Sequence, residues 1–360
     1  MCVGKNRNGI SEQSGDWMLF SPLSAGAMFT LVGVSALHAR NRHLLGYDMA
    51  RLACSHAALA PFLRTRPDGQ QTVDFSDPAA VSTLNAALLV SDYSYDFSLP
   101  PGHLTPAVPG RADYIHLLAD LLAEDGTGEV PTGCSVVGMD VGVGASGVYP
   151  LVGHADYGWS FLGTDVSAAS LSSCERLARR NSVPLELRRQ PEPRAVLRGV
   201  LQPTDRLAFT MCNPPFYASA EEASAAAARK WRGLGKGARK DATRSFAGQP
   251  HELYCDGGER AFVRRLIRES AAPERRAAAL WFTSLVSAAK SMPALRAELR
   301  DARPAATREL VLSTSNKGMR VLAWTFQGDA ERRRAVRALH NGERKTAYCS
   351  ALARNNDKIR

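Results

Sequence analysis

From Ser135 onward, short apolar runs alternate with segments of helical periodicity, and this alternation constrains the fold more than any other feature. It is typical of a parallel sheet with helices on both faces, so we expect an α/β fold. Helices are predicted near residues 167–181, 257–270 and 288–302. Seven strands are predicted, near residues 135–140, 160–166, 185–190, 206–213, 278–286, 308–314 and 320–327.

The region before the sheet is predicted to be helical. Residues from Leu44 to Arg64 show helical spacing of their apolar side chains. Asp77 is placed to cap a second helix, with Pro78 at its first position. A third helix is expected to run from Arg111 through Leu122. These segments together predict a small helical module in front of the sheet domain.

The first residues of the chain contain a long uncharged run. It extends from Met18 to Ala36, 19 residues, but proline, glycine and serine dilute it. We interpret it as part of a disordered or dispensable extension, in preference to an export signal, a transit peptide or a membrane anchor. The expected division is an extension at 1–36, a helical module at 37–130, a sheet domain at 131–330 and a basic C-terminal tail at 331–360.

A stiff turn follows the fourth predicted strand, in the sequence Asn213-Pro214-Pro215-Phe216. The prolines end the strand and restrict the backbone of Asn213. The Asn213 side-chain oxygen and the Pro214 carbonyl can accept the two hydrogens of a planar amine, while Phe216 stacks on its ring. The alternative is an ordinary Pro-Pro turn with a core Phe. A cofactor site nearby would favour methylation of the amine.

A glycine-rich turn directly after the first strand predicts that cofactor site. It begins at Asp140 and includes Gly142, Gly144 and Ser146, and glycines let the backbone approach a ligand closely. Asp165, at the end of the second strand, is placed to bind a ribose diol or to cap the following helix. The glycine spacing also fits a dinucleotide, so an NAD dehydrogenase competes. Hydride transfer has no use for Asn-Pro-Pro-Phe, whereas methyl transfer from S-adenosylmethionine does.

The charge balance favours a phosphate-rich partner. The net charge is +10, and residues 229–244 hold seven basic residues against one acid. This loop could clamp phosphates while its tryptophan stacks on a base, although a loop charged only for solubility is the alternative. No Cys-x-x-Cys pair or His cluster predicts a metal site. The RNA-binding residues predicted are Arg229, Lys230, Trp231, Arg232, Lys236, Arg239 and Lys240, with Arg40 and Arg42 from a basic arm.

Several segments together resemble the bacterial methyltransferases that modify the N-6 amine of an adenine in large-subunit ribosomal RNA. Eukaryotic relatives that methylate a spliceosomal small nuclear RNA are similar, but less closely. The likeness runs from about Arg40 to Phe326. It is carried by residues 38–42, 73–75, 108–116, 140–150, 212–216, 252–259 and 281–285.

The resemblance implies a Rossmann-like methyltransferase sheet of seven strands whose last strand, containing Trp324, is antiparallel. It implies that Gly142 and Ser146 contact S-adenosylmethionine, that Asp165 binds its ribose, and that Arg111 binds its carboxylate end. Asp165 stands where the eukaryotic relatives carry Glu. Asn213 would hold the target amine, and Pro214, Pro215 and Phe216 would shape the adenine pocket.

The resulting expectation is a monomeric, cytoplasmic enzyme that methylates an adenine of large-subunit ribosomal RNA, with a helical module that binds RNA. In a eukaryotic host, a nuclear or organellar location would replace the cytoplasm. Three alternatives stay open at this point. They are methylation of a small nuclear RNA, methylation of DNA or of a protein glutamine, and a methyltransferase fold that only binds RNA.

Overall fold

The computed structural model describes residues 37–100, 103, 106–233, 249–312 and 319–342. Within these ranges, the side chains of residues 227–233 and 250–251 lie outside the description. The extension predicted at 1–36 and most of the basic tail, from residue 343 on, lie outside the described residues. No helix in the described ranges is long and apolar enough to cross a membrane.

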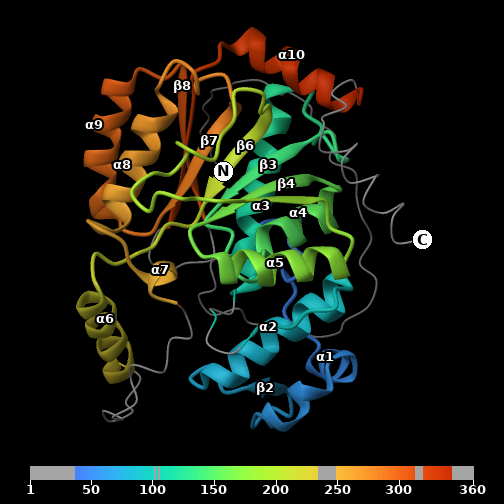
Figure 1. Ribbon diagram of the computed structural model, residues 1–360. Helices are drawn as coiled ribbons and strands as arrows, with labels where there is room; N and C mark the ends of the chain where they lie inside the picture. Colours follow the sequence, from blue (N-terminus) through green and yellow to red (C-terminus); the bar gives the residue numbers. More distant parts are fainter. Residues whose placement is uncertain (1–36, 101–102, 104–105, 234–248, 313–318, 343–360) are drawn as a thin grey trace, which may run out of the picture. The chain divides into compact units, whose positions relative to one another are not determined.

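A seven-stranded sheet forms the centre of the protein (Figure 1). The strand order is β5-β4-β3-β6-β7-β9-β8. The strands from β5 to β7 are parallel, and β9 runs antiparallel between β7 and β8. This confirms the prediction of seven strands with an antiparallel last strand. Their bounds are β3 Val137–Val141, β4 Ser160–Asp165, β5 Leu185–Arg189, β6 Leu207–Cys212, β7 Ala279–Val286, β8 Ala306–Val311 and β9 Arg320–Thr325.

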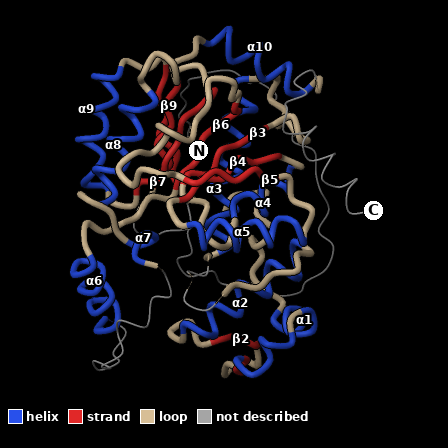
Figure 2. Tube along the Cα trace, in the orientation of Figure 1, coloured by secondary structure: helices blue, strands red, loops and turns tan. Residues whose placement is uncertain are grey.

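The central strands are buried on both faces because helices cover each side of the sheet (Figure 2). One hydrophobic core joins the sheet to α3 (Val108–Asp125), α4 (Val148–Tyr157), α5 (Ala168–Arg180) and α10 (Asp329–His340). A second core joins it to α8 (Gly258–Ser270) and α9 (Met292–Ala302), the latter preceded by a short 3-10 turn, η3 (Ala289–Ser291). The predicted helices at 167–181, 257–270 and 288–302 correspond to α5, α8 and η3–α9.

The N-terminal region contains helices and a small hairpin. The prediction of one helix from Leu44 to Arg64 is wrong, because α1 (Met49–Ser55) ends early. A 3-10 turn, η1 (Ala57–Phe62), contains Pro61, which cannot donate to a continuing α-helix. The chain then forms a hairpin from β1 (Leu63–Thr65) and β2 (Gln71–Val73).

The second predicted helix is α2 (Pro78–Tyr93), and its start is confirmed. The Asp77 carboxylate accepts a hydrogen bond from the Ala79 amide at 2.9 Å. The same hydrophobic core includes Leu88 of α2, Ile115 of α3 and Phe209 of β6. The helical region thus packs directly on the sheet, and its division from the sheet domain at residue 130 stays a prediction.

Candidate active site

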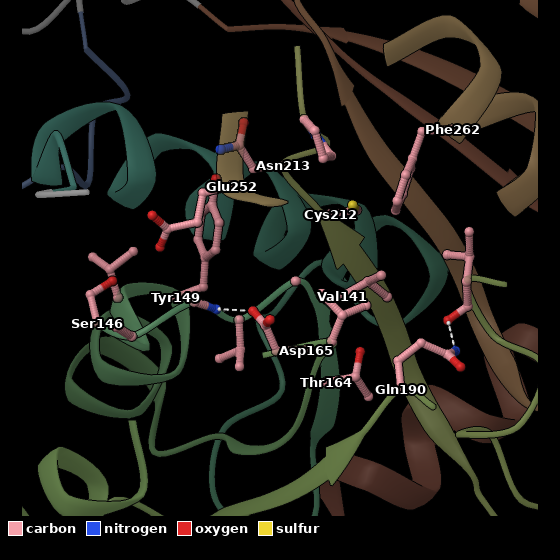
Figure 3. A pocket seen from close by; sticks show the side chains of 18 of the residues that line it. Val141, Ser146, Tyr149, Thr164, Asp165, Gln190, Cys212, Asn213, Glu252 and Phe262 are labelled. Atoms are coloured by element: carbon pink, nitrogen blue, oxygen red, sulfur yellow. Dashed lines mark hydrogen bonds between the residues drawn. The ribbon is translucent and has the colours of Figure 1, made fainter. Parts of the chain in front are cut away.

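A pocket lies at the carboxyl ends of β3, β4 and β6 (Figure 3). Parallel strands present ligand sites at this edge, as the sequence predicted. The pocket brings together residues from many separate parts of the chain. Of the predicted site residues, the following line it: Arg111, Gly142, Gly144, Ser146, Asp165, Asn213 and Pro215.

The glycine-rich turn forms one wall of the pocket. Gly142 and Gly144 have φ angles of +76° and +66°, a region that glycine adopts without strain. The amides of Gly142 and Val143 both donate to the Thr164 carbonyl at 2.9 Å, which anchors the turn to β4. A Cβ atom on Gly142 would meet no protein atom within 4 Å. The open space beside Gly142 lets a ligand approach the backbone closely.

Asp165 fastens this turn from the end of β4. Its Oδ2 atom accepts from the Gly144 amide at 3.0 Å, the contact drawn in Figure 3. Its Oδ1 atom accepts from the Ser167 amide at 2.8 Å. The N-cap of α5 is Ser167, which accepts from Ser170, so the interpretation of Asp165 as the cap is wrong. Asp165 also lines the pocket, where its carboxylate can accept from a diol.

Asp140 has a different position from the other predicted cofactor residues. Its side chain is buried within β3 and is not among the described residues that line the pocket. Neither carboxyl oxygen has a hydrogen-bond partner among the described residues. Burial raises the pKa of Asp140 to about 8, although Arg111 opposes the shift. The group is therefore mostly protonated at neutral pH.

Arg111 reaches the pocket from the first turn of α3. Its guanidinium lies 5.5 Å from the centre of the Tyr149 ring. The alternative that Arg111 pairs with Asp113 is not what the structure shows. Asp113 instead accepts from the His38 amide at 3.0 Å and from the Asn41 side chain at 2.6 Å.

His116, further along α3, is a packed helix residue, as predicted. Its Nδ1 atom contacts the Tyr157 hydroxyl at 2.8 Å, and its ring is buried. Burial lowers the pKa of His116 to about 3, so the ring stays neutral. It does not line the pocket and has no part in the candidate chemistry.

The Asn-Pro-Pro-Phe turn leaves β6 at the rim of the pocket. The Asn213 Oδ1 atom is buried and has no hydrogen-bond partner among the described residues. Such an acceptor is costly unless a ligand satisfies it. Pro215 lines the pocket, while Pro214 and Phe216 are not among the described lining residues.

Two buried hydroxyl groups hold the end of β6 in place. Strand pairing between β6 and β7 ends at Thr210. Beyond it, the Thr283 hydroxyl donates to the Thr210 carbonyl at 2.7 Å, and the Tyr114 hydroxyl contacts Thr283 at 2.7 Å. The Cys212 amide donates to the Tyr114 hydroxyl at 3.4 Å. This chain of contacts fixes the strand just before Asn213.

Sequence reasoning missed several lining residues, above all Tyr149, Glu252 and Phe262. Tyr149 and Phe262 belong to helices whose apolar residues are expected in a core, so no local sequence pattern distinguishes them from core residues. Glu252 lies in a segment that carried the family resemblance, but no role followed from its type. Gln190, directly after β5, also lines the pocket.

The basic residues predicted to bind RNA are only partly described. Arg40 contacts Asp120 at 2.7 Å and donates to the Tyr157 hydroxyl at 2.9 Å. Arg42 contacts Asp156 at 2.7 Å. Both side chains thus tie the N-terminal segment to α3 and α4, and a role in RNA binding stays a prediction.

The loop predicted at 229–244 begins inside a helix, α6 (Ala220–Gly233), so the prediction of a loop is wrong for residues 229–233. The side chains of these residues are outside the description. Lys236, Arg239 and Lys240 lie outside the described residues altogether. Their contact with RNA therefore stays a prediction from composition.

Comparison with known proteins gives a consistent result. A model of an RNA methyltransferase family matches residues 32–328. The ribosomal RNA large subunit methyltransferase F of Pseudomonas entomophila is 45% identical over 301 residues, covering 82% of this chain and 95% of that protein. The protein of the same name from Ectopseudomonas mendocina is 43% identical over 317 residues, covering 86% and 94%.

Solved structures of human METTL16 are also similar. Its catalytic domain in complex with MAT2A 3'UTR hairpin 6 has a TM-score of 0.65 and 27% identity, covering 82% of this chain and 98% of that one. Its N-terminal domain in complex with SAH has a TM-score of 0.64 and 25% identity, covering 81% and 99%. The resemblance inferred from the sequence is confirmed by both kinds of relative.

Proposed function

This chain belongs to the RNA methyltransferase family, and we propose that it methylates the N-6 amine of an adenine in large-subunit ribosomal RNA. The observation that carries this proposal is the Asn213 side-chain oxygen, which lies buried at the pocket with no hydrogen-bond partner among the described residues. It supplies an acceptor where a planar amine would enter. The relatives named as ribosomal RNA methyltransferases support the substrate class.

The cofactor is S-adenosylmethionine, whose sulfonium supplies the methyl group as an electrophile. The pocket fits such a ligand, because the glycine turn leaves open space beside Gly142. Asp165 presents a carboxylate that can accept from the ribose hydroxyls. Arg111 presents a guanidinium that can bind the carboxylate of the methionine moiety.

The catalytic contribution of the chain is positioning. The Asn213 oxygen and the Pro214 carbonyl accept the two amine hydrogens, which directs the nitrogen lone pair toward the cofactor. The proposed role of Phe216 is to stack on the adenine ring. The amine loses its proton after attack, so a strong base is unnecessary.

The alternatives differ in what supports them. The alternative of an NAD dehydrogenase is excluded because the chain belongs to an RNA methyltransferase family. A protein that only binds RNA would have no need for the buried Asn213 acceptor and an open glycine turn. Small nuclear RNA is less favoured than ribosomal RNA, because the ribosomal relatives are 45% identical and the METTL16 structures 27%. The monomeric state and the cytoplasmic location stay predictions.

A methyl-incorporation assay with Asn213→Ala tests the proposal. Large-subunit ribosomal RNA from cells that lack this gene is the substrate, and Asn341→Ala, at the exposed end of α10, is the matched control. We expect Asn213→Ala to lose about 100-fold or more in kcat, as when one preorganised hydrogen-bond partner is removed. Asn341→Ala should retain full activity.

Two results would contradict the proposal. Retained activity in Asn213→Ala would remove this residue from the site. We also expect large-subunit RNA from the same cells to lack one N-6-methyladenosine. If every modified adenine were still present, large-subunit RNA would not be the substrate.

A further inference from the structure

Glu252 is a pocket residue with no assigned role. It lies in a short helix, α7 (Pro250–Leu253), after the segment that predicts RNA contact. Its Oε2 atom accepts from the Gln249 amide at 2.6 Å. Its Oε1 atom faces the glycine turn, 3.8 Å from the place where a Cβ of Gly144 would lie. Figure 3 shows Glu252 among the side chains that line the pocket.

The carboxylate of Glu252 is largely shielded from water. Its side chain is 11% exposed, and the His103 Nδ1 atom lies 3.9 Å from Oε1. That distance is too long for a hydrogen bond. Within the described part of the chain, the hydrogen bond of the Glu252 carboxylate uses Oε2, so Oε1 can accept one from a ligand.

The other acids near the glycine turn are less able to serve this end of the pocket. Asp165 is held by the Gly144 and Ser167 amides. Asp140 does not line the pocket and is mostly protonated at neutral pH. Among the described residues, Glu252 is therefore the lining acid whose Oε1 atom is open to a ligand beside the turn.

Arg111 provides the opposite charge in the same pocket. It lies over the Tyr149 ring, and Arg111, Tyr149 and Glu252 all line this pocket. One guanidinium and one carboxylate in the same pocket match the two charges of an α-amino acid. Charge-assisted hydrogen bonds in a partly buried site are strong and selective.

We propose that Glu252 binds the α-ammonium group of the methionine moiety of the cofactor, while Arg111 binds the carboxylate. This inference rests on the proposed function, because it concerns the same cofactor. In this assignment Glu252 selects the cofactor, whereas Asn213 positions the adenine amine for methylation. Glu252 would thereby distinguish intact cofactor from analogues that lack the amine.

Calorimetric binding of two neutral-sulfur ligands tests this assignment. The first is S-adenosylhomocysteine, and the second is its analogue in which a keto group replaces the α-amine. The wild type, Glu252→Gln and Asp256→Asn are compared. Asp256 is exposed, lies four residues away and does not line the pocket, so it controls for the loss of one negative charge.

We expect Glu252→Gln to weaken the binding of S-adenosylhomocysteine about tenfold, which corresponds to ~1.4 kcal/mol of binding free energy. The keto analogue should bind Glu252→Gln and the wild type equally. Asp256→Asn should bind both ligands like the wild type.

Equally weakened binding of both ligands to Glu252→Gln would show that Glu252 only holds the start of α7 through the Gln249 amide, and would overturn the inference. Unchanged binding of S-adenosylhomocysteine would overturn it as well. In both cases the proposed function survives, because the wild type still binds. Absence of binding to the wild type would instead refute the proposed cofactor.

Discussion

The buried carboxyl group of Asp140 makes the stability of the cofactor-free protein depend on pH. Both of its oxygens are buried without partners among the described residues, and its pKa rises from 3.8 to about 8 on folding. The neutral form is thus favoured in the folded protein and the ionised form in the unfolded chain. The protonated group stabilises the fold fully below pH 3.8, and this contribution is lost as the pH rises toward 8.

The size of the effect follows from proton counting. Between pH 5 and 7, the folded state keeps one proton on Asp140 that the unfolded chain has released. The free energy of unfolding then falls by about 1.4 kcal/mol per pH unit from this group. Over the two units, the contribution falls by about 3 kcal/mol.

Urea unfolding at pH 5, 6 and 7 measures this contribution in wild type and Asp140→Asn. The amide does not titrate, so the stability of Asp140→Asn relative to the wild type should increase by about 3 kcal/mol from pH 5 to pH 7. Asp68→Asn, in the exposed turn between β1 and β2, controls for the loss of a carboxyl group. Parallel pH dependences for wild type and Asp140→Asn would refute the reasoning, because the buried group would then be ionised at pH 5.

The sheet could be predicted because its strands are buried on both faces. Strands such as β6 and β7 are mostly apolar, and their ends were located within one or two residues. The β1–β2 hairpin was missed because its exposed residues, including Arg64, fit a helical pattern equally well. Periodicity alone could not exclude a helix there.

The parts of the site that lie within one chain segment could be predicted. The glycine turn and the Asn213 turn both follow strands directly, so their places at the sheet edge could be inferred. Glu252 and Tyr149 reach the pocket from other elements, and only the fold brings them together. The ion pairs of Arg40 and Arg42 could not be predicted, since their acidic partners, Asp120 and Asp156, are 80 and 114 residues away in the sequence.

Two further substitutions separate structural from catalytic roles. Arg42→Ala should lower the free energy of unfolding by about 1–2 kcal/mol, because Asp156 loses its partner; urea unfolding measures this. An unchanged stability would contradict the anchoring role of Arg42. Tyr114→Phe should lower stability by a similar ~1–2 kcal/mol and should also lower kcat, because the Cys212 amide loses its acceptor next to Asn213.

The effect of Tyr114 on catalysis can be distinguished from its effect on folding. Tyr95→Phe is the matched control, because the Tyr95 hydroxyl is buried and donates to the Leu151 carbonyl at 2.8 Å, away from the pocket lining. Both variants should lose comparable stability. Only Tyr114→Phe should lose kcat, by about tenfold to 100-fold, since a small displacement of the Asn213 turn misaligns the amine. Its affinity for S-adenosylhomocysteine should not change. Equal kcat values for the two variants would mean that the hydroxyl pair supports the core and does not position Asn213.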